Sequence, residues 1–130
     1  MEKRRVGQTK LEIDILGLGG APLGGNFADL GYAQAEELIK AAKNIGIGYF
    51  DTAPWYGFGR SERVMGDVLR GSEYILSDKV GRLLAPGPVK NPADFGMVDP
   101  LPFTVVYDYS YDGIMRAYED NLQRLGLDRT

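Results

Sequence analysis

Short apolar runs alternate with segments of helical periodicity along most of this sequence. Residues 4–6 and 11–13 alternate between apolar and polar side chains on either side of a turn that contains Gly7, which predicts a β-hairpin. Three short apolar runs come next, and each of them predicts a buried strand. These runs occupy residues 15–18, 47–50 and 74–77.

Helical spacing of apolar residues fills the gaps between the predicted strands. One helix is expected to end at Gly46, and a second, with Ser61 as its N-cap, at Gly71. A third is expected to begin after Ser110 and to end at Gly126. Regular alternation of strands and helices predicts an α/β fold, in which helices cover a parallel sheet.

Residues 81–110 interrupt this alternation. The segment holds five prolines and three glycines, and a connection of this length is typically functional or disordered. We therefore expect a long loop there. The whole chain then contains an N-terminal hairpin and about three βα units, whereas a closed (β/α)8 TIM barrel needs about 250 residues. The 130 residues are expected to form the N-terminal part of a single barrel domain, incomplete in this chain.

Composition excludes several classes of function. The chain has no cysteine and no histidine, so it lacks thiolate metal ligands and the usual general base, and we expect no metal. Its formal net charge is −3, and its one basic cluster, at residues 3–5, is too short to indicate a nucleic-acid partner. Neither a membrane-spanning run nor an apolar signal segment is present. We expect a cytoplasmic protein without a membrane partner.

A glycine-rich turn follows the first predicted strand after the hairpin. Residues 17–22 depart from the dinucleotide-binding fingerprint, which needs a glycine where Pro22 stands and a helix that begins at once. A phosphate cradle of that type is therefore excluded. Two interpretations remain for Gly19 and Gly20, a flexible turn at a strand end or a close approach of the backbone to a flat ligand ring.

Three polar residues lie at or near the ends of predicted strands. Asp51 follows a buried strand, Tyr56 comes five residues later in a loop, and Lys79 ends the next strand. Chemistry in parallel α/β proteins takes place at the carboxyl ends of the strands. Adjacent strands lie about 4.8 Å apart, so Asp51 and Lys79 are expected to pair. The residues alone leave two readings open, a structural ion pair beside a packed tyrosine or a catalytic group.

Acting together, the three residues suit proton transfer at an oxygen atom. A tyrosine has an unperturbed pKa of about 10, and a nearby ammonium favours its ionised form. With Asp51 holding Lys79, Tyr56 would give a proton to a carbonyl oxygen or take one from an alcohol. The hydride has to come from a cofactor, because no side chain supplies one.

Short motifs spread over nearly the whole chain occur in a characteristic order. They are Gly17-Leu18-Gly19, Asp51-Thr52-Ala53, Tyr56-Gly57, Ser61-Glu62-x-x-Met65-Gly66, Lys79 and Gln123-Arg124-Leu125-Gly126-Leu127. This series resembles the aldo-keto reductases, which are (β/α)8 barrels that bind a nicotinamide dinucleotide without a Rossmann domain. A narrower resemblance, to the branch with sugar 1-dehydrogenases and pyridoxal 4-dehydrogenases, comes from residues 79–82, 101–103 and 108–113.

The resemblance implies an NAD(P)-dependent oxidoreductase that interconverts a carbonyl and an alcohol of an aldose, pyridoxal-like or related small molecule. It implies catalytic roles for Asp51, Tyr56 and Lys79, with Tyr56 as the acid or base. The cofactor is NADP or NAD. The cofactor-binding residues that the resemblance implies are Gly19, Gly20, Ala21 and Asp51.

Three further residues near these motifs have two readings each. Trp55 is a wall of the substrate pocket or a packing residue for the 81–110 segment. Asp78 stands where the family usually has threonine, so its carboxylate either points into the helix layer or competes with Asp51 for the lysine. Arg82 is a solvated surface residue or a contact for an anionic or polyhydroxylated substrate.

The fourth catalytic residue of the family, a histidine, follows the fourth barrel strand, and this strand would begin close to Thr130. We therefore expect the 130 residues on their own to be inactive. The alternatives are a truncated non-catalytic fragment or a barrel subunit that binds a cofactor. The sequence leaves open the substrate, the reaction direction, the choice between NAD and NADP and the oligomeric state.

Overall fold

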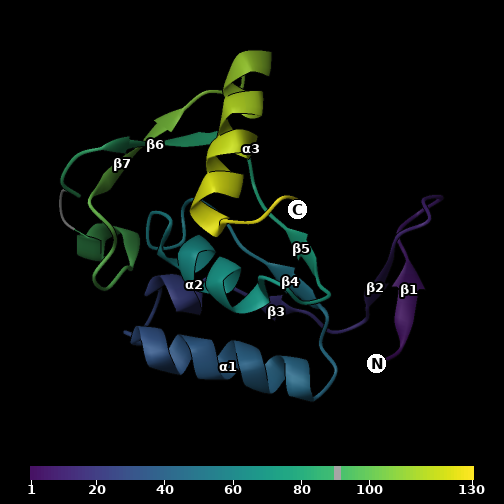
Figure 1. The fold of residues 1–130 in the computed structure, drawn as a ribbon. Coiled ribbons are helices and arrows are strands. Elements are labelled where there is room, and N and C mark those ends of the chain that lie inside the picture. Colours follow the sequence, from purple (N-terminus) through teal and green to yellow (C-terminus); the bar gives the residue numbers. More distant parts are fainter. Residues whose placement is uncertain (90–91) are drawn as a thin grey trace.

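Three parallel strands form the centre of the fold in the computed structural model, which describes residues 1–89 and 92–130 (Figure 1). They are β3 (Leu18–Gly19), β4 (Tyr49–Asp51) and β5 (Ile75–Ser77), and they pair in that order. Their register aligns Gly19 with Asp51 and Asp51 with Ser77. The predicted parallel α/β architecture is confirmed, and the three strands form an open sheet.

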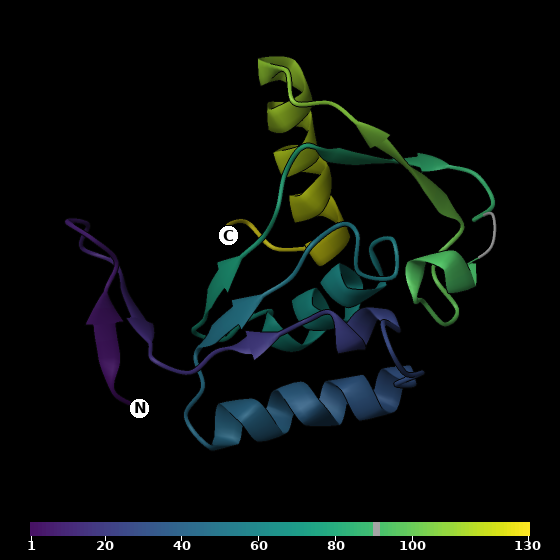
Figure 2. The same cartoon turned by 180° about the vertical axis from the view of Figure 1, so that it is seen from behind.

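Helices α1 (Tyr32–Asn44) and α2 (Arg60–Leu69) cover one face of this sheet, and Figure 2 shows the sheet from its other side. The third helix, α3 (Tyr111–Leu125), packs against α2. A Cβ added at Gly66 of α2 would lie 1.8 Å from the carbonyl oxygen of Leu125, so only glycine allows the two helices to approach this closely. The core that joins sheet and helices consists of Leu23, Ala35, Ile39, Ala42, Ile47, Phe50, Val64, Met65, Leu69, Leu76 and Leu125.

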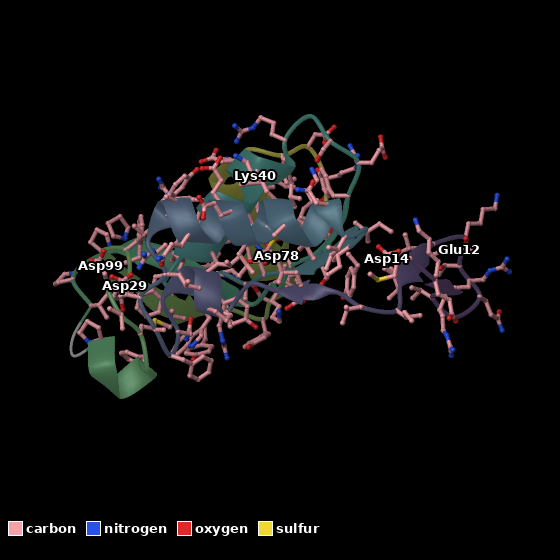
Figure 3. The ribbon with its side chains drawn as sticks, turned by 90° about the horizontal axis from the view of Figure 1, so that it is seen from below. Glu12, Asp14, Asp29, Lys40, Asp78 and Asp99 are labelled. Atoms are coloured by element: carbon pink, nitrogen blue, oxygen red, sulfur yellow. The ribbon has the colours of Figure 1, made fainter. Side chains whose placement is uncertain are left out.

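The N-terminal hairpin is confirmed and projects from the rest of the structure. Its strands, β1 (Lys3–Arg5) and β2 (Glu12–Asp14), pair antiparallel. Figure 3 shows Glu12 and Asp14 on this projection, to one side of the central sheet and helices. One anchor is the side chain of Asp14, whose Oδ2 accepts a hydrogen bond of 2.6 Å from the backbone N–H of Gly48.

The segment 81–110 is not the long loop that its prolines predict. It contains a second antiparallel hairpin of β6 (Arg82–Pro86) and β7 (Phe103–Tyr107). Both prolines near the strand ends are compatible with pairing, because Pro86 is the last residue of β6 and Pro102 precedes β7. The connection includes a short 3-10 turn, η2 (Pro92–Phe95), and a second such turn, η1 (Pro22–Gly24), follows β3.

Arg60 ties the connection between β6 and β7 to the loop after β3. Its guanidinium donates to the carbonyl oxygens of Val98 and Asp99 and forms an ion pair of 3.0 Å with Asp29. Figure 3 shows Asp29 and Asp99 next to each other at this junction. Arg60 thereby connects the loop after β3 with the segment between β6 and β7, although the two are far apart in the sequence.

The helix caps agree with the sequence at α3 and differ at α2. The hydroxyl of Ser110 accepts a hydrogen bond from the backbone N–H of Gly113 and caps α3 as expected. Helix α2 begins one residue before Ser61, and its N-cap is Gly59, with a φ of +95°. Ser61 is fully buried and donates to the carbonyl oxygen of Gly20. The prediction of Ser61 as N-cap is therefore wrong, because a tertiary contact uses its hydroxyl.

No helix within residues 1–89 and 92–130 has the length and apolar character needed to cross a membrane.

Candidate active site

Asp51 and Lys79 meet at the edge of the sheet where the parallel strands end. The Nζ of Lys79 lies 2.6 Å from Oδ1 of Asp51, which confirms the expected ion pair. The same Nζ donates to the carbonyl oxygen of Thr52 at 2.8 Å. The other carboxylate oxygen of Asp51, Oδ2, accepts a hydrogen bond of 2.7 Å from Ser77. With both oxygens engaged, Asp51 holds the ammonium in one position.

Tyr56 lies beside this ion pair. The Nζ of Lys79 is 5.0 Å from the centroid of the Tyr56 ring, within the range of a cation–π contact. Burial lowers the pKa of Lys79, but hydrogen bonding and charge from Asp51, with a smaller contribution from Tyr56, raise this pKa above its ordinary value overall. Lys79 is therefore a cation at neutral pH, adjacent to a phenol. Asp51, Tyr56 and Lys79 thus come together in space.

The glycine-rich turn after β3 lies against the end of β4. The N–H of Gly20 donates to the carbonyl oxygen of Asp51 at 2.7 Å, and its own carbonyl accepts from Ser61 at 2.8 Å. A Cβ at Gly20 would lie 2.5 Å from the Ser61 hydroxyl, so the turn is held against α2. A Cβ at Gly19 would meet no atom within 4 Å. The backbone of Gly19, Gly20 and Ala21 is therefore anchored on one side and open at Gly19.

Trp55 packs against other aromatic side chains and also lines a cavity. Its ring makes edge-to-face contacts with Phe58 and Phe95 at centroid distances of 5.5 and 5.3 Å. An apolar cavity of about 540 Å³ lies between these rings and the β6–β7 hairpin, where Phe103 and Tyr107 contribute to its wall. The hairpin therefore borders this cavity, and Arg82 at the start of β6 lines a smaller hollow together with Lys79.

A polar network behind the sheet fixes the backbone of Lys79. The side-chain amide of Asn121 donates to the carbonyl oxygen of Lys79 at 2.9 Å. The guanidinium of Arg124 donates to Asn121 and makes two hydrogen bonds, of 2.7 and 3.0 Å, with the fully buried carboxylate of Glu62. Glu62 and Arg124 belong to the motifs of the resemblance, but the sequence provides no sign that they meet or that Asn121 joins them.

Asp78 points into the helix layer and does not compete with Asp51. Its Oδ1 accepts a hydrogen bond from the backbone N–H of Lys79 at 2.8 Å. Its Oδ2 is buried and has no hydrogen-bond partner among the residues that the structure describes. Burial, followed by the negative charge of Glu62, raises the pKa of Asp78 to about 8. Arg124 donates hydrogen bonds to both carboxylate oxygens of Glu62, which favours the ionised form of Glu62. Of the two neighbouring carboxyl groups, Asp78 and Glu62, we therefore assign the proton to Asp78.

Replacing Asp78 by asparagine is expected to stabilise the protein, and more so as the pH rises. The folded protein keeps the Asp78 proton up to its pKa of about 8, whereas the unfolded chain releases it near 3.8. Raising the pH between these values favours unfolding of the wild type only. We expect a gain in the free energy of unfolding on the order of 5 kcal/mol at about pH 8, and little gain at about pH 4.

Urea unfolding at several pH values, on the wild type and the Asp78→Asn variant of the complete gene product, measures the difference. Asparagine keeps an acceptor for the N–H of Lys79, so the local geometry is preserved. A difference that does not vary with pH would show that Asp78 is ionised in the folded protein.

Comparison with known proteins finds relatives that match nearly the whole of this chain. The profile of the aldo/keto reductase family matches residues 15–130. The chain is 48% identical to a pyridoxal 4-dehydrogenase from Microbacterium luteolum, a match that covers 97% of this chain and 40% of the relative. It is 38% identical to a D-threo-aldose 1-dehydrogenase from a Pseudomonas species, over 92% of this chain and 38% of the relative.

Two solved structures superpose on nearly the whole of this chain but extend well beyond it. A glycerol dehydrogenase from Gluconobacter oxydans superposes with a TM-score of 0.73 at 26% identity, over 97% of this chain and 36% of that one. An aldo-keto reductase from Bacillus halodurans superposes with a TM-score of 0.74 at 28% identity, over 98% of this chain and 37% of that one. The chain therefore spans about 40% of the length of the relatives that it matches.

Proposed function

Because this chain belongs to the aldo/keto reductase family, we propose that it supplies Asp51, Tyr56 and Lys79 to the active site of an NAD(P)-dependent oxidoreductase. The observation that carries the proposal is the 2.6 Å ion pair between Lys79 and Asp51, with the ring of Tyr56 next to the ammonium. A barrel subunit without chemistry has no need of these three side chains together, so their arrangement favours an enzyme.

Each of the three side chains has one task in the proposed reaction. Tyr56 gives its hydroxyl proton to the carbonyl oxygen in the reducing direction, and its phenolate takes the proton of the alcohol in the oxidising direction. Lys79 stabilises the negative charge that Tyr56 acquires. Asp51 keeps Lys79 charged and in place through the contact with Oδ1. A bound nicotinamide supplies or accepts the hydride, which no side chain can do.

The turn at Gly19 and Gly20 suits a flat ring beside the reacting atoms. Its backbone is anchored to Asp51 and Ser61, and the missing side chain of Gly19 leaves open space above it. We propose that Gly19, Gly20, Ala21 and Asp51 line the nicotinamide end of the cofactor site. The adenine end and the fourth catalytic residue, a histidine, are proposed to come from the rest of a longer chain.

The proposed substrate is a small carbonyl compound or the corresponding alcohol, of the aldose or pyridoxal type. Two relatives, named as a pyridoxal 4-dehydrogenase and a D-threo-aldose 1-dehydrogenase, support this choice and the oxidising direction. Trp55, which lines the cavity below the β6–β7 hairpin, is the proposed wall of the substrate pocket.

Two measurements in sequence test the proposal. The first reads the coding sequence beyond Thr130, where we expect a fourth strand followed by histidine. The second assays the complete gene product with NAD or NADP and aldoses or pyridoxal, by the absorbance of the reduced nicotinamide. We expect turnover from the complete product and none from residues 1–130 alone. A reading frame that stops at Thr130, or a complete product without turnover, would overturn the proposal.

A further inference from the structure

Arg82 is a cation near the candidate active site that the proposed reaction does not use. It is the first residue of β6, three positions after Lys79. Its guanidinium carbon lies 4.8 Å from the ring of Trp55 and 5.6 Å from the ring of Tyr107. Tyr107 is its direct partner in the β6–β7 register. The guanidinium is thus held by two aromatic rings, one from the β4–α2 loop and one from the hairpin.

The backbone before Arg82 is constrained as well. Gly81 has a φ of +87°, and a Cβ there would lie 2.2 Å from the ring of Tyr109. A side chain at this position would therefore clash and is strained in any case. The turn before Arg82 therefore packs closely against the ring of Tyr109. The two ring contacts hold the guanidinium in place.

The ring contacts of Arg82 with Trp55 and Tyr107 do not use the N–H donors of its guanidinium. Within residues 1–89, 92 and 95–130 it forms no ion pair and no side-chain hydrogen bond, whereas Arg60 and Arg124 each bind a carboxylate. Aromatic rings contact the flat faces of a guanidinium, and the N–H groups point outward in its plane. This planar edge matches two oxygens of a carboxylate or phosphate.

Arg82 also faces the same space as Lys79. Both side chains line a hollow of about 190 Å³, together with Ala53 and Pro54 of the segment that joins Asp51 to Trp55. The charge of Lys79 is balanced by Asp51 at 2.6 Å, but the charge of Arg82 is balanced by no described carboxylate. Among the described residues the hollow therefore carries one positive charge without a carboxylate partner, and such a charge attracts an anionic ligand.

We propose that Arg82 is a specificity-determining residue that binds an oxyanion of the substrate, a carboxylate or a phosphate ester, through its outward N–H groups. This inference rests on the proposed function, because it assigns the substrate class of the same site. Trp55 and Tyr107 orient the guanidinium, and Tyr56 and Lys79 act on the carbonyl or alcohol at the other end of the substrate. Uncharged substrates of the same shape are then bound more weakly.

Matched substrate pairs test the inference in the complete gene product. Galactose and galacturonate differ in one carboxylate, and glyceraldehyde and glyceraldehyde 3-phosphate in one phosphate. For one pair we expect a higher kcat/KM for the charged member. Arg82→Met is expected to raise KM for the charged member by about 10- to 100-fold, which is the contribution of a hydrogen bond to a charged group. The kcat for the charged member and both constants for the neutral member are expected to change little. Arg82→Lys keeps the charge but loses the planar edge, and it is expected to recover part of the lost affinity for the charged member.

Arg116 offers a matched control, because it is an exposed arginine on α3. Arg116→Met is expected to leave kcat/KM unchanged for both members of each substrate pair. The inference is overturned if Arg82→Met affects charged and neutral substrates equally, or if wild type has no charge preference in either pair. The first result would mean that Arg82 only fastens the hairpin to Trp55.

Failure of the proposed function has a different signature, namely no turnover of any substrate by wild type. In that case, calorimetric titration with galacturonate and with glyceraldehyde 3-phosphate still decides the inference. Binding that Arg82→Met abolishes supports an oxyanion site, and binding that is absent, or unchanged in the variant, overturns it.

Discussion

If the proposed function holds, replacing Tyr56 by phenylalanine in the complete gene product is expected to lower kcat by about 10²- to 10⁴-fold, the usual contribution of a positioned acid or base. The substitution removes one oxygen atom and keeps the ring that lies 5.0 Å from the Nζ of Lys79. The ion pair between Lys79 and Asp51 does not involve that oxygen. Cofactor binding is therefore expected to remain as in wild type, while proton transfer is lost.

Steady-state turnover and a fluorescence titration with the reduced cofactor measure the two quantities separately. Tyr111→Phe is the matched control, because Tyr111 is an exposed residue at the start of α3, with 78% of its surface accessible. We expect the control to keep full activity. Full turnover in Tyr56→Phe would remove Tyr56 from the reaction, and parallel loss of cofactor affinity would assign it a structural role.

Replacing Arg124 by methionine is expected to lower the free energy of unfolding by about 3–5 kcal/mol, because it leaves a buried carboxylate without its partner. Glu62 is fully buried, and Arg124 provides two hydrogen bonds to it. The same guanidinium orients Asn121, which holds the carbonyl of Lys79. We therefore also expect lower turnover in the folded fraction of this variant.

Urea unfolding of the complete gene product measures the loss, with Arg116→Met as a surface control that is expected to change stability by less than about 0.5 kcal/mol. The double variant Glu62→Gln/Arg124→Met removes the buried charge together with its partner. It is expected to be more stable than Arg124→Met alone, since the unpaired ion causes most of the loss. Equal stability of the single and double variants would show that packing, and not charge, explains the effect.

Local signals in the sequence predicted the three helices, the strand-end residues and the central strands, although the strand predicted at residues 15–18 is wrong in extent, because β3 is only Leu18–Gly19 and Ile15 and Leu16 are exposed. The alternation of strands and helices predicted the parallel sheet that β3, β4 and β5 form, and the cap at Ser110 depends on a residue only three positions away. The pairing of Asp51 with Lys79 followed from the same pattern, because parallel neighbours bring their carboxyl ends to one edge. In each of these cases, chain-local preference and the final fold agree.

Contacts between distant segments account for what the sequence did not predict. The β6–β7 hairpin was hidden by its prolines, which are compatible with pairing only because Pro86 ends its strand and Pro102 lies before the next. Ser61 looks like an N-cap by position, yet its hydroxyl is taken by Gly20, 41 residues earlier. The buried hydroxyl of Ser61 needs a hydrogen-bond partner, and the folded chain places the carbonyl oxygen of Gly20 next to it. Which residues become buried together depends on the complete fold.

The sequence by itself determined the α/β class, the family and the residues that gather at the strand ends, because these depend on periodicity and on short motifs. Only the tertiary structure decided how they are supported and what surrounds them. It joined Glu62 to Arg124 across 62 positions and held Arg82 between Trp55 and Tyr107. Such contacts depend on packing in three dimensions, for which the order of residues along the chain carries no local signal.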